Sequence, residues 1–146
     1  MAEKALGKIR KFRIEDINKI FEIEQQAFPK TAYSKKTLLH YANRSPYTFI
    51  VIENGKDIVG YLIFDINGHI HSTAVKPAYR RKGFGRMLFM YALKLTKKRV
   101  WLEVRSKNPS AITFYKRLGM KIIGKIPNYY GIDDALVMVF DQKECD

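Results

Sequence analysis

The chain has 146 residues, of which 47% are hydrophobic and 13% aromatic, which excludes a disordered chain and suits a folded domain with a buried core. Its formal net charge of +13 predicts a positive field that attracts phosphates, acidic proteins or nucleic acid, without choosing among them. No apolar run approaches the roughly 20 residues of a membrane helix, no signal-peptide pattern opens the chain, and its one cysteine, Cys145, can form no internal disulfide.

We therefore expect one cytoplasmic domain over residues 1–146, since the sequence also contains no repeat, low-complexity tract or linker. Residues 8–12 are predicted to form a short strand. The apolar spacing of residues 17–28 indicates an amphipathic helix with Asp16 near its N-cap. Ser34 can cap a second helix, and Pro46 marks its exit.

Three stretches of β-forming residues follow, at residues 47–52, 58–64 and 69–75. They are separated by the pairs Asn54-Gly55 and Asn67-Gly68. These pairs are strong hairpin signals, because asparagine and glycine both tolerate the positive φ angles of a type I′ turn. An antiparallel meander is the consequence.

The rest of the chain is predicted to alternate helices with strands. The expected helices are residues 83–97 and 109–118, and the expected strands are residues 99–104, 121–126 and 135–140. Strand, glycine-rich turn, helix and strand make a βαβ crossover, so the strands ending at Val75 and Val104 should be parallel neighbours. The fold class is α/β or α+β, with a mixed sheet of about seven strands and about four helices covering both faces.

The turn after the strand predicted at residues 69–75 carries the first functional signal. Gly83 and Gly85 lie where a strand gives way to a helix, and the N–H groups and positive dipole end of such a helix can hold a pyrophosphate. On spacing alone, a surface turn is an equally good interpretation. The surrounding cations favour a ligand with several phosphates. They are Arg80, Arg81, Lys82 and Arg86.

The segment Val75-x-Pro77-x-x-Arg80-Arg81-x-Gly83-x-Gly85-Arg86 resembles the acetyl-CoA-binding motif of the GNAT acetyltransferase superfamily. The resemblance covers about residues 7–140. It includes Leu102-Glu103-Val104-Arg105 and Asn128-Tyr129-Tyr130, which resemble RimI-type ribosomal-protein alanine N-acetyltransferases and archaeal N-terminal acetyltransferases. It implies a GNAT-like acyl-CoA N-acyltransferase fold and acetyl-CoA as cosubstrate.

The resemblance also implies roles for individual residues. Glu103 corresponds to the general base and Tyr115 to the general acid. The backbone of Thr73, Ala74 and Val75 would bind the pantetheine arm. The residues implied to lie around the pyrophosphate and the cofactor arm are Arg80, Arg81, Lys82, Gly83, Phe84, Gly85, Arg86 and Asn108. The residues implied to form the peptide entrance are Phe28, Tyr33, Tyr129 and Tyr130.

Strand periodicity agrees with a catalytic role for Glu103. Alternation places Trp101, Glu103 and Arg105 on one face of their strand, so a carboxylate lies among large side chains. A carboxylate there can accept a proton from an ammonium group. The alternative is a structural ion pair between Glu103 and Arg105 or a nearby lysine.

Tyr115 lies beside an apolar stripe that should face the core, formed by Ala111, Phe114 and Leu118. A phenol with a pKa near 10 can protonate a departing thiolate. The alternative is a half-buried tyrosine that only packs.

No metal site is predicted. His69 and His71 lie on one strand face, but the sequence shows no third ligand, and about three or four are normal for zinc. Cys145 has no histidine nearby in sequence, so a covalent cysteine mechanism is not expected either.

The leading hypothesis is direct transfer of the acetyl group from acetyl-CoA to the N-terminal α-amine of ribosomal or other proteins. About one tenth of an α-amine is neutral at pH 7, against about four in ten thousand for a lysine amine. One alternative is a GNAT enzyme that acetylates lysine side chains or a small amine. A third hypothesis, supported by charge alone, is a non-catalytic basic module that binds nucleic acid or the ribosome. Neither a membrane nor nucleic acid is required as a partner, and the oligomeric state is not predicted.

Overall fold

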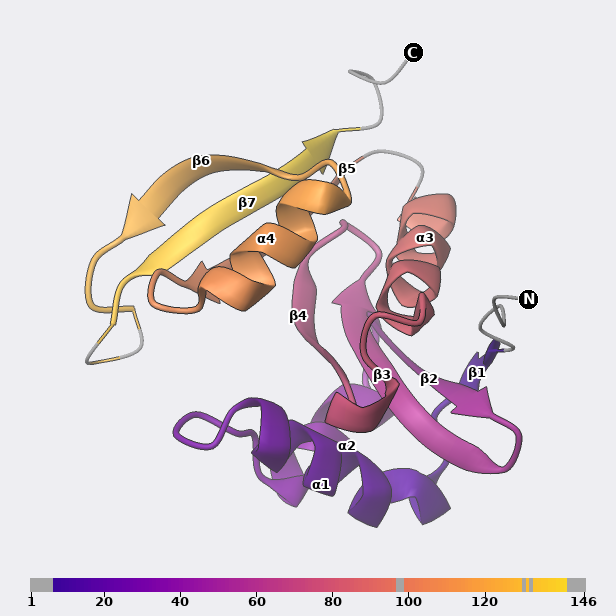
Figure 1. Cartoon of the computed structure of the whole chain (residues 1–146). Helices are drawn as coiled ribbons and strands as arrows, with labels where there is room; N and C mark the ends of the chain where they lie inside the picture. The colour runs from indigo at the N-terminus through magenta and orange to yellow at the C-terminus, as the bar shows by residue number, and fades with distance from the viewer. Residues whose placement is uncertain (1–6, 97–98, 130, 132, 142–146) are drawn as a thin grey trace.

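A computed structural model of the chain describes residues 7–96, 99–129, 131 and 133–141 (Figure 1). The strands in these residues are β1 (Gly7–Lys11), β2 (Tyr47–Asn54), β3 (Asp57–Asp65), β4 (Ile70–Val75), β5 (Arg99–Arg105), β6 (Lys121–Ile126) and β7 (Ala135–Asp141). The α-helices are α1 (Ile17–Ala27), α2 (Lys35–Asn43), α3 (Phe84–Thr96) and α4 (Pro109–Arg117). Short 3-10 turns precede α1, at Ile14–Asp16, and α3, at Pro77–Tyr79. These elements confirm the predicted order and lie within two residues of the predicted bounds.

The first four strands form an antiparallel sheet in the order β1-β2-β3-β4, as the meander predicts. The two middle strands are buried along most of their length because helices cover both faces of the sheet. The predicted type I′ turns are wrong, however. Of the described residues other than glycine, only Arg81 and Asn128 have positive φ, so the asparagine of neither Asn-Gly pair adopts it.

Each hairpin places only its glycine in the left-handed region. Asn54 still pairs with Asp57, so the loop begins one residue later than predicted, with Gly55 at φ 65°. In the second hairpin the Asp65 carboxylate accepts a hydrogen bond from the Asn67 N–H, at 2.9 Å. A carboxylate that bonds the backbone two residues on sets the turn itself.

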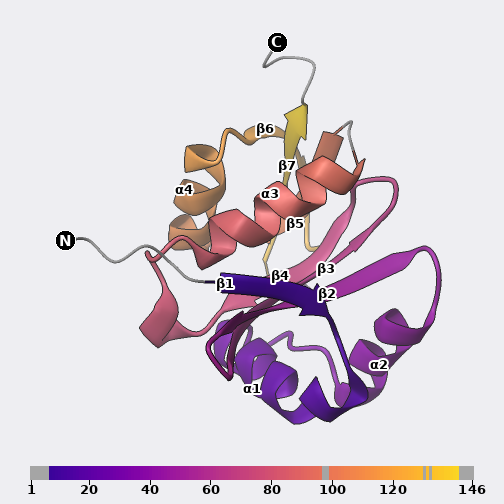
Figure 2. The ribbon, with the colours of Figure 1, turned by 90° about the vertical axis from the view of Figure 1, so that its right-hand side faces the viewer.

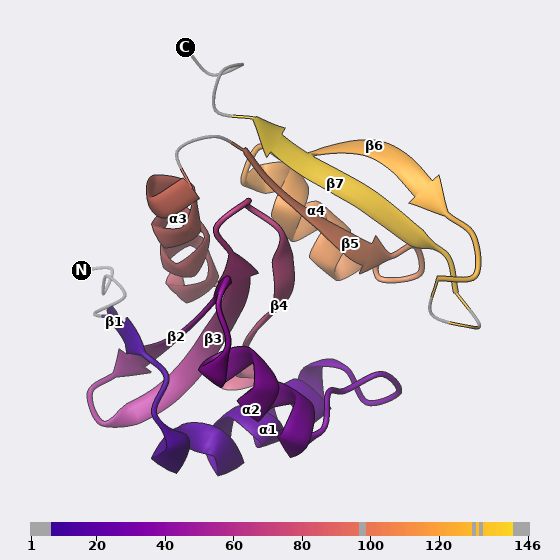
Figure 3. The same ribbon diagram turned by 180° about the vertical axis from the view of Figure 1, so that it is seen from behind.

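The last three strands form a second antiparallel sheet in the order β5-β7-β6. Among the described residues the two sheets meet at one parallel bridge, between His69 and Trp101, where the Trp101 N–H donates to the Gly68 carbonyl at 3.0 Å. This bridge confirms that β4 and β5 are parallel neighbours at their beginnings. Beyond it the two strands diverge (Figure 3).

Helices cover both faces of the first sheet, as predicted (Figure 2). Helices α1 and α2 pack on one face and bury Ile20, Ile23 and Leu38 against β2 and β3. Helix α3 packs on the other face and buries Leu88 in a core that it shares with α4 and the second sheet. No helix among the described residues is long and apolar enough to cross a membrane.

Two of the four helices end or begin as the sequence predicts. The Ser34 hydroxyl accepts a hydrogen bond from the Thr37 N–H at 3.1 Å and caps α2. Gly119, with φ 103°, follows α4. The prediction that Phe114 faces the core is wrong. Its side chain is 38% exposed, and a Cβ added at Gly85 would lie 2.8 Å from its ring, so Phe114 covers the start of α3.

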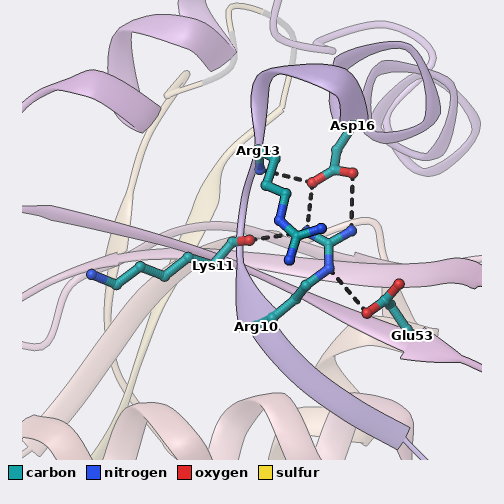
Figure 4. A network of polar contacts seen from close by, with 5 residues as sticks. All are labelled: Arg10, Lys11, Arg13, Asp16 and Glu53. Carbon is teal, nitrogen blue, oxygen red and sulfur yellow. Dashed lines mark hydrogen bonds and ion pairs between the residues drawn. The ribbon is translucent and has the colours of Figure 1, made fainter.

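Asp16 occupies the N-cap position of α1, but its side chain makes no capping bond to that helix. The carboxylate instead accepts hydrogen bonds from the Arg10 guanidinium, at 2.8 and 3.0 Å, and from the Arg13 N–H, at 2.8 Å (Figure 4). Arg10 also donates to Glu53 at 2.9 Å, so β1, β2 and the turn before α1 are tied together.

Candidate active site

The divergence of β4 from β5 leaves one edge of β4 without a strand partner. Thr73, Ala74 and Val75 pair with β3 on one side only, and the described residues form no ladder on the other side. The Thr73 hydroxyl donates to the Tyr61 carbonyl at 2.9 Å, which holds this side chain against β3. Alternate backbone groups of β4 therefore point away from β3, toward the side on which β5 diverges. We call this side the opening between the sheets, and a ligand could bond to the backbone groups there.

The predicted phosphate-binding turn connects this free edge of β4 to the N-terminus of α3. Arg81, with φ 61°, and Gly83, with φ 92°, take the left-handed conformations that the turn requires. Phe84 is 2% exposed and anchors the first turn of the helix in the core. The Arg80 Nε donates to the Val75 carbonyl at 3.2 Å, so the turn is fixed to the end of the strand. Exposed residues surround the helix N-terminus, and they are Arg80, Arg81, Lys82, Gly83 and Arg86.

Asn108 lies at the N-terminus of α4, where its side-chain oxygen accepts a hydrogen bond from the Ala111 N–H at 3.1 Å. The residue thus caps the helix with one side of its amide. The NH₂ side of the same amide remains a donor that can serve a ligand.

Glu103 is half-buried on β5, and its Oε2 lies 2.8 Å from the Nε2 atom of His69. Arg105 pairs with Asp133 instead, at 3.3 Å. The suggested ion pair between Glu103 and Arg105 is therefore wrong. The imidazole of His69 also stacks on Trp101, with ring centroids 5.2 Å apart and planes 1° apart. These contacts fix the geometry of a histidine–carboxylate pair at the point where the sheets separate.

The hydrogen bond to Glu103 raises the pKa of His69 above its ordinary value, although burial acts in the opposite direction. Sequence reasoning missed this partnership. The signal was present, because His69 begins one of the two strands predicted to be parallel neighbours and Glu103 lies on the other. The residue was considered only as a metal ligand.

The aromatic residues implied to form the peptide entrance lie on two loops. Burial is the main cause that raises the pKa of Tyr33, and a hydrogen bond with the neighbouring Tyr41 is the second. Burial is also the main cause that raises the pKa of Tyr129, and the charges of Glu103 and Tyr41 raise it further. These phenols are therefore neutral at physiological pH and can pack against a peptide or hydrogen-bond to it. Phe28 is half-buried and follows the last residue of α1. Tyr130 lies outside the described residues.

Two loops that carry these aromatic residues project to the same side of the molecule (Figure 1). One is the acceptor loop, which we define as residues 28–34 between α1 and α2. The other joins β6 to β7 and contains Tyr129. Residues from distant parts of the sequence, Tyr33 and Tyr129, thus influence one another electrostatically, and Tyr129 is also influenced by Glu103. Their role as a peptide entrance stays a prediction.

A buried carboxylate that the sequence analysis did not single out holds the acceptor loop in place. Glu24 is 2% exposed, and its Oε2 accepts a hydrogen bond from the Tyr33 N–H at 3.0 Å. Its Oε1 accepts from the Ser72 hydroxyl at 2.9 Å and from the Tyr61 phenol. Burial is the main cause that raises the pKa of Tyr61 well above its ordinary value, and the charge of Glu24 is the second. Helix α1, strand β4 and the acceptor loop are therefore joined through one side chain.

Tyr115 is partly buried on α4, packed against the core that α3 and the second sheet share. Its phenol acts electrostatically on Tyr61 of β3. The half-buried environment agrees with the packing interpretation, and the role as proton donor stays a prediction.

The structure places a third potential metal ligand beside His69 and His71. Asp65 joins His69 and His71, and one ligand atom from each lies within 4.8 Å of the others. The third ligand was hidden because Asp65 comes from the end of the preceding strand. Cys145 lies outside the described residues.

A pocket of about 700 Å³ lies elsewhere on the molecule and is lined by residues 42–48, Phe64, Ile66, Leu95 and Thr96. None of the predicted site residues lines it. The candidate site is therefore the opening between the two sheets, with its phosphate-binding turn and its histidine–carboxylate pair.

Known proteins resemble this chain in sequence and in fold. The sequence model of the acetyltransferase (GNAT) family matches residues 17–120. A Bacillus subtilis protein, provisionally named a ribosomal protein bS18-alanine N-acetyltransferase, is 35% identical over 146 residues, covering 92% of this chain and 95% of that protein. An N-alpha-acetyltransferase from Sulfurisphaera tokodaii is 32% identical over 161 residues, covering 94% and 96%. The crystal structure of Ard1 from Thermoplasma volcanium superposes with a TM-score of 0.80 and 30% identity, covering 92% of this chain and 97% of that chain.

Proposed function

The chain belongs to the acetyltransferase (GNAT) family, and from that premise we propose that it transfers the acetyl group of acetyl-CoA to the N-terminal α-amine of a protein. The observation that carries the proposal is the Glu103–His69 pair, 2.8 Å apart at the mouth of the opening between β4 and β5. Glu103 is a proton acceptor that influences Tyr129, an aromatic residue of the β6–β7 loop that suits a peptide.

The residues of the opening fit acetyl-CoA, which supplies an activated thioester. The free edge of β4 offers backbone groups from Thr73 to Val75 to the amide-containing pantetheine arm. The exposed cations and the N-terminus of α3 offer charge and N–H donors to the phosphates. Asn108 would add an amide donor.

The proposed chemistry needs a neutral amine, a polarised carbonyl and a protonated leaving group. Glu103 takes a proton from the ammonium group of the acceptor, and His69 holds the carboxylate in position for this transfer. The amine nitrogen then bonds to the acetyl carbon as the carbon–sulfur bond breaks. Tyr115 donates a proton to the departing thiolate, and the second proton that the nitrogen loses on becoming an amide restores the Tyr115 phenol. Backbone N–H groups of β4 would stabilise the oxyanion.

An α-amine is the favoured acceptor on two grounds. It is neutral at pH 7 about two hundred times more often than a lysine amine, because the reference pKa values differ by more than two units. The names of the Bacillus and Sulfurisphaera relatives also specify an alanine amine and an α-amine. The Bacillus name further suggests a ribosomal protein as one acceptor to test.

A peptide panel with acetyl-CoA, read by mass spectrometry, tests this proposal. The panel contains peptides that begin with alanine, serine or methionine, each with a free and a blocked N-terminus and one internal lysine. We expect acetylation on free N-termini only. Acetylation confined to the lysines, or to a small amine such as spermidine, would instead support the alternative GNAT activity.

The variant Glu103→Gln tests the assignment of the base. Loss of a positioned base typically lowers the rate about 10²–10⁴-fold, so we expect kcat to fall by that order with little change in acetyl-CoA affinity. Steady-state kinetics and calorimetry measure the two quantities. Wild-type kcat in this variant would disprove the role, and Glu22→Gln on the exposed face of α1 is the matched control.

A further inference from the structure

Three potential metal ligands converge at the start of β4, and we call them the His–Asp cluster: Asp65, His69 and His71. Asp65 ends β3, and the two histidines share a strand face because they are two residues apart. Imidazole nitrogens and a carboxylate oxygen are ligands that Zn²⁺ accepts, whereas Mg²⁺ favours oxygen alone. The donor set thus matches a borderline-soft divalent cation.

The turn between β3 and β4 orients the aspartate of this cluster. The Oδ1 atom of Asp65 accepts hydrogen bonds from the Asn67 N–H at 2.9 Å and the His69 N–H at 3.3 Å. Its Oδ2 atom is left facing His71, whose Nε2 lies 2.9 Å away. A ligand held by such outer bonds needs little reorganisation when a metal arrives.

Aromatic rings hold the two imidazoles. His69 stacks on Trp101, and the His71 ring lies 5.2 Å from Tyr41 and 5.1 Å from Tyr47. The histidine rings are themselves 4.3 Å apart. Both rings are thus held in place, side by side, before any ligand arrives.

The cluster remains open to an ion and has a further carboxylate within reach. The side chains of His69, His71 and Asp65 are 24%, 15% and 12% exposed, so solvent reaches all three. Glu103 lies 2.8 Å from the Nε2 atom of His69 and can provide a fourth ligand. Four ligands complete the tetrahedral shell that Zn²⁺ prefers.

We propose that Asp65, His69 and His71 bind one Zn²⁺ ion, and that the bound ion inhibits acetyl transfer by engaging His69 and Glu103. Ion binding follows from the geometry of the cluster alone. Inhibition also rests on the proposed function, because it requires Glu103 to act as the base. The ion would hold the carboxylate that must accept a proton from the acceptor amine.

Isothermal titration calorimetry of the metal-stripped full chain with ZnCl₂ tests binding. Cys145→Ser is the background for every variant, which removes the one thiol as a competing ligand. We expect one Zn²⁺ per chain, no binding of MgCl₂, and an affinity at least about tenfold lower in His71→Asn and Asp65→Asn. His40→Asn removes an exposed histidine outside the cluster and should bind like the parent.

A titration in which His71→Asn and Asp65→Asn bind Zn²⁺ as tightly as the parent would overturn the proposal. Circular dichroism confirms that each variant is folded before titration. The visible absorption of Co²⁺ bound in place of Zn²⁺ provides a second measurement, because tetrahedral nitrogen and oxygen ligands give intense bands that octahedral aqueous Co²⁺ lacks. An unchanged aqueous spectrum would also count against the site.

Acetylation assays then test inhibition. We expect Zn²⁺ to inhibit the parent chain, EDTA to reverse the inhibition, and His71→Asn to retain activity but resist the ion. Equal inhibition of both proteins would show that Zn²⁺ acts elsewhere and would overturn the inhibitory role. If the chain acetylates no amine at all, the proposed function fails while the calorimetry still decides whether the site exists.

Discussion

Glu24 is a buried carboxylate whose three donors come from different parts of the fold: a loop amide, a phenol on β3 and a hydroxyl on β4. Hydrogen bonds to a charged group are stronger than neutral ones, and buried donors that lose their acceptor carry a desolvation cost. The residue therefore links stability to the position of the acceptor loop.

We expect Glu24→Ala to destabilise the chain by about 3 kcal/mol, because it removes the charged acceptor that three donors share, two of them buried. Glu24→Gln keeps one acceptor oxygen and should cost less. Urea unfolding followed by circular dichroism measures both. Glu22→Ala, on the exposed face of the same helix, should stay within about 0.5 kcal/mol of wild type. Similar losses for Glu24→Ala and Glu22→Ala would contradict the network.

The ion pair of Asp16 predicts how the stability of the chain depends on pH. Burial alone would raise its pKa, but hydrogen bonds from Arg10 and the Arg13 N–H outweigh burial and lower the pKa below its ordinary value of 3.8. A lowered folded-state pKa adds stability above the unfolded pKa, and this stability is lost as pH falls toward the folded pKa. Asp16→Asn should therefore cost about 2 kcal/mol at pH 7, and the cost should shrink below about pH 4. Urea unfolding at pH 7, 5 and 3 measures it, and a pH-independent difference would refute the assignment.

Individual residues were predictable to the extent that local pattern or family resemblance carried the information. The strand face that carries Glu103 was predicted correctly, and so was the Ser34 cap, whereas the catalytic role of Glu103 stays a prediction. The partner of Glu103, His69, was not predicted, because the two residues are 34 positions apart in sequence. Glu24 was missed for the same reason, since nothing local distinguishes a buried glutamate from the exposed ones around it.

At the scale of elements, the turn between β3 and β4 does more than reverse the chain. Its Gly68 carbonyl accepts the hydrogen bond that joins the two sheets, and its aspartate orients the His–Asp cluster. The turn packs so closely on β5 that a Cβ atom at Gly68 would overlap the Arg99 carbonyl oxygen. Gly68 also has φ 100°, which a side chain rarely adopts.

We expect Gly68→Ala to destabilise the chain by about 3 kcal/mol or more, since backbone must move in addition to the conformational strain of about 1–3 kcal/mol. Gly55→Ala is the matched control. It also has positive φ, at 65°, but an added Cβ meets nothing within 4 Å, so only about 1–2 kcal/mol should be lost. Thermal unfolding compares the two variants. Equal shifts in Tm would show that the contact with Arg99 is unimportant.

The elements themselves were predicted well because periodicity, caps and turn residues are local signals. The divergence of β4 from β5 was not predicted. It depends on how two sheets twist against their helices, which no stretch of the sequence records. Helix α4 shows the same limit. The spacing of apolar residues predicted that Phe114 faces the core, whereas its side chain covers the start of α3.

At the scale of the whole molecule, two cores lie on opposite faces of the first sheet, and only one of them extends to the second sheet. The net charge of +13 agrees with a chain that binds a phosphate-rich cosubstrate, although most of its lysines lie on the solvated surface. Fold class and layer order followed from the sequence. How the two sheets join did not.

The single bridge between the sheets has a consequence for the exchange of amide hydrogens with deuterium. Amides of Thr73–Val75 that point into the opening are bonded to no neighbouring strand among the described residues, so they should exchange quickly in the free chain. Saturating acetyl-CoA should slow their exchange, because the proposed pantetheine contacts replace the missing strand. Amides in the centre of β3 should change little, and mass spectrometry of peptic fragments can compare the two segments. The cosubstrate would then complete the sheet on which it reacts.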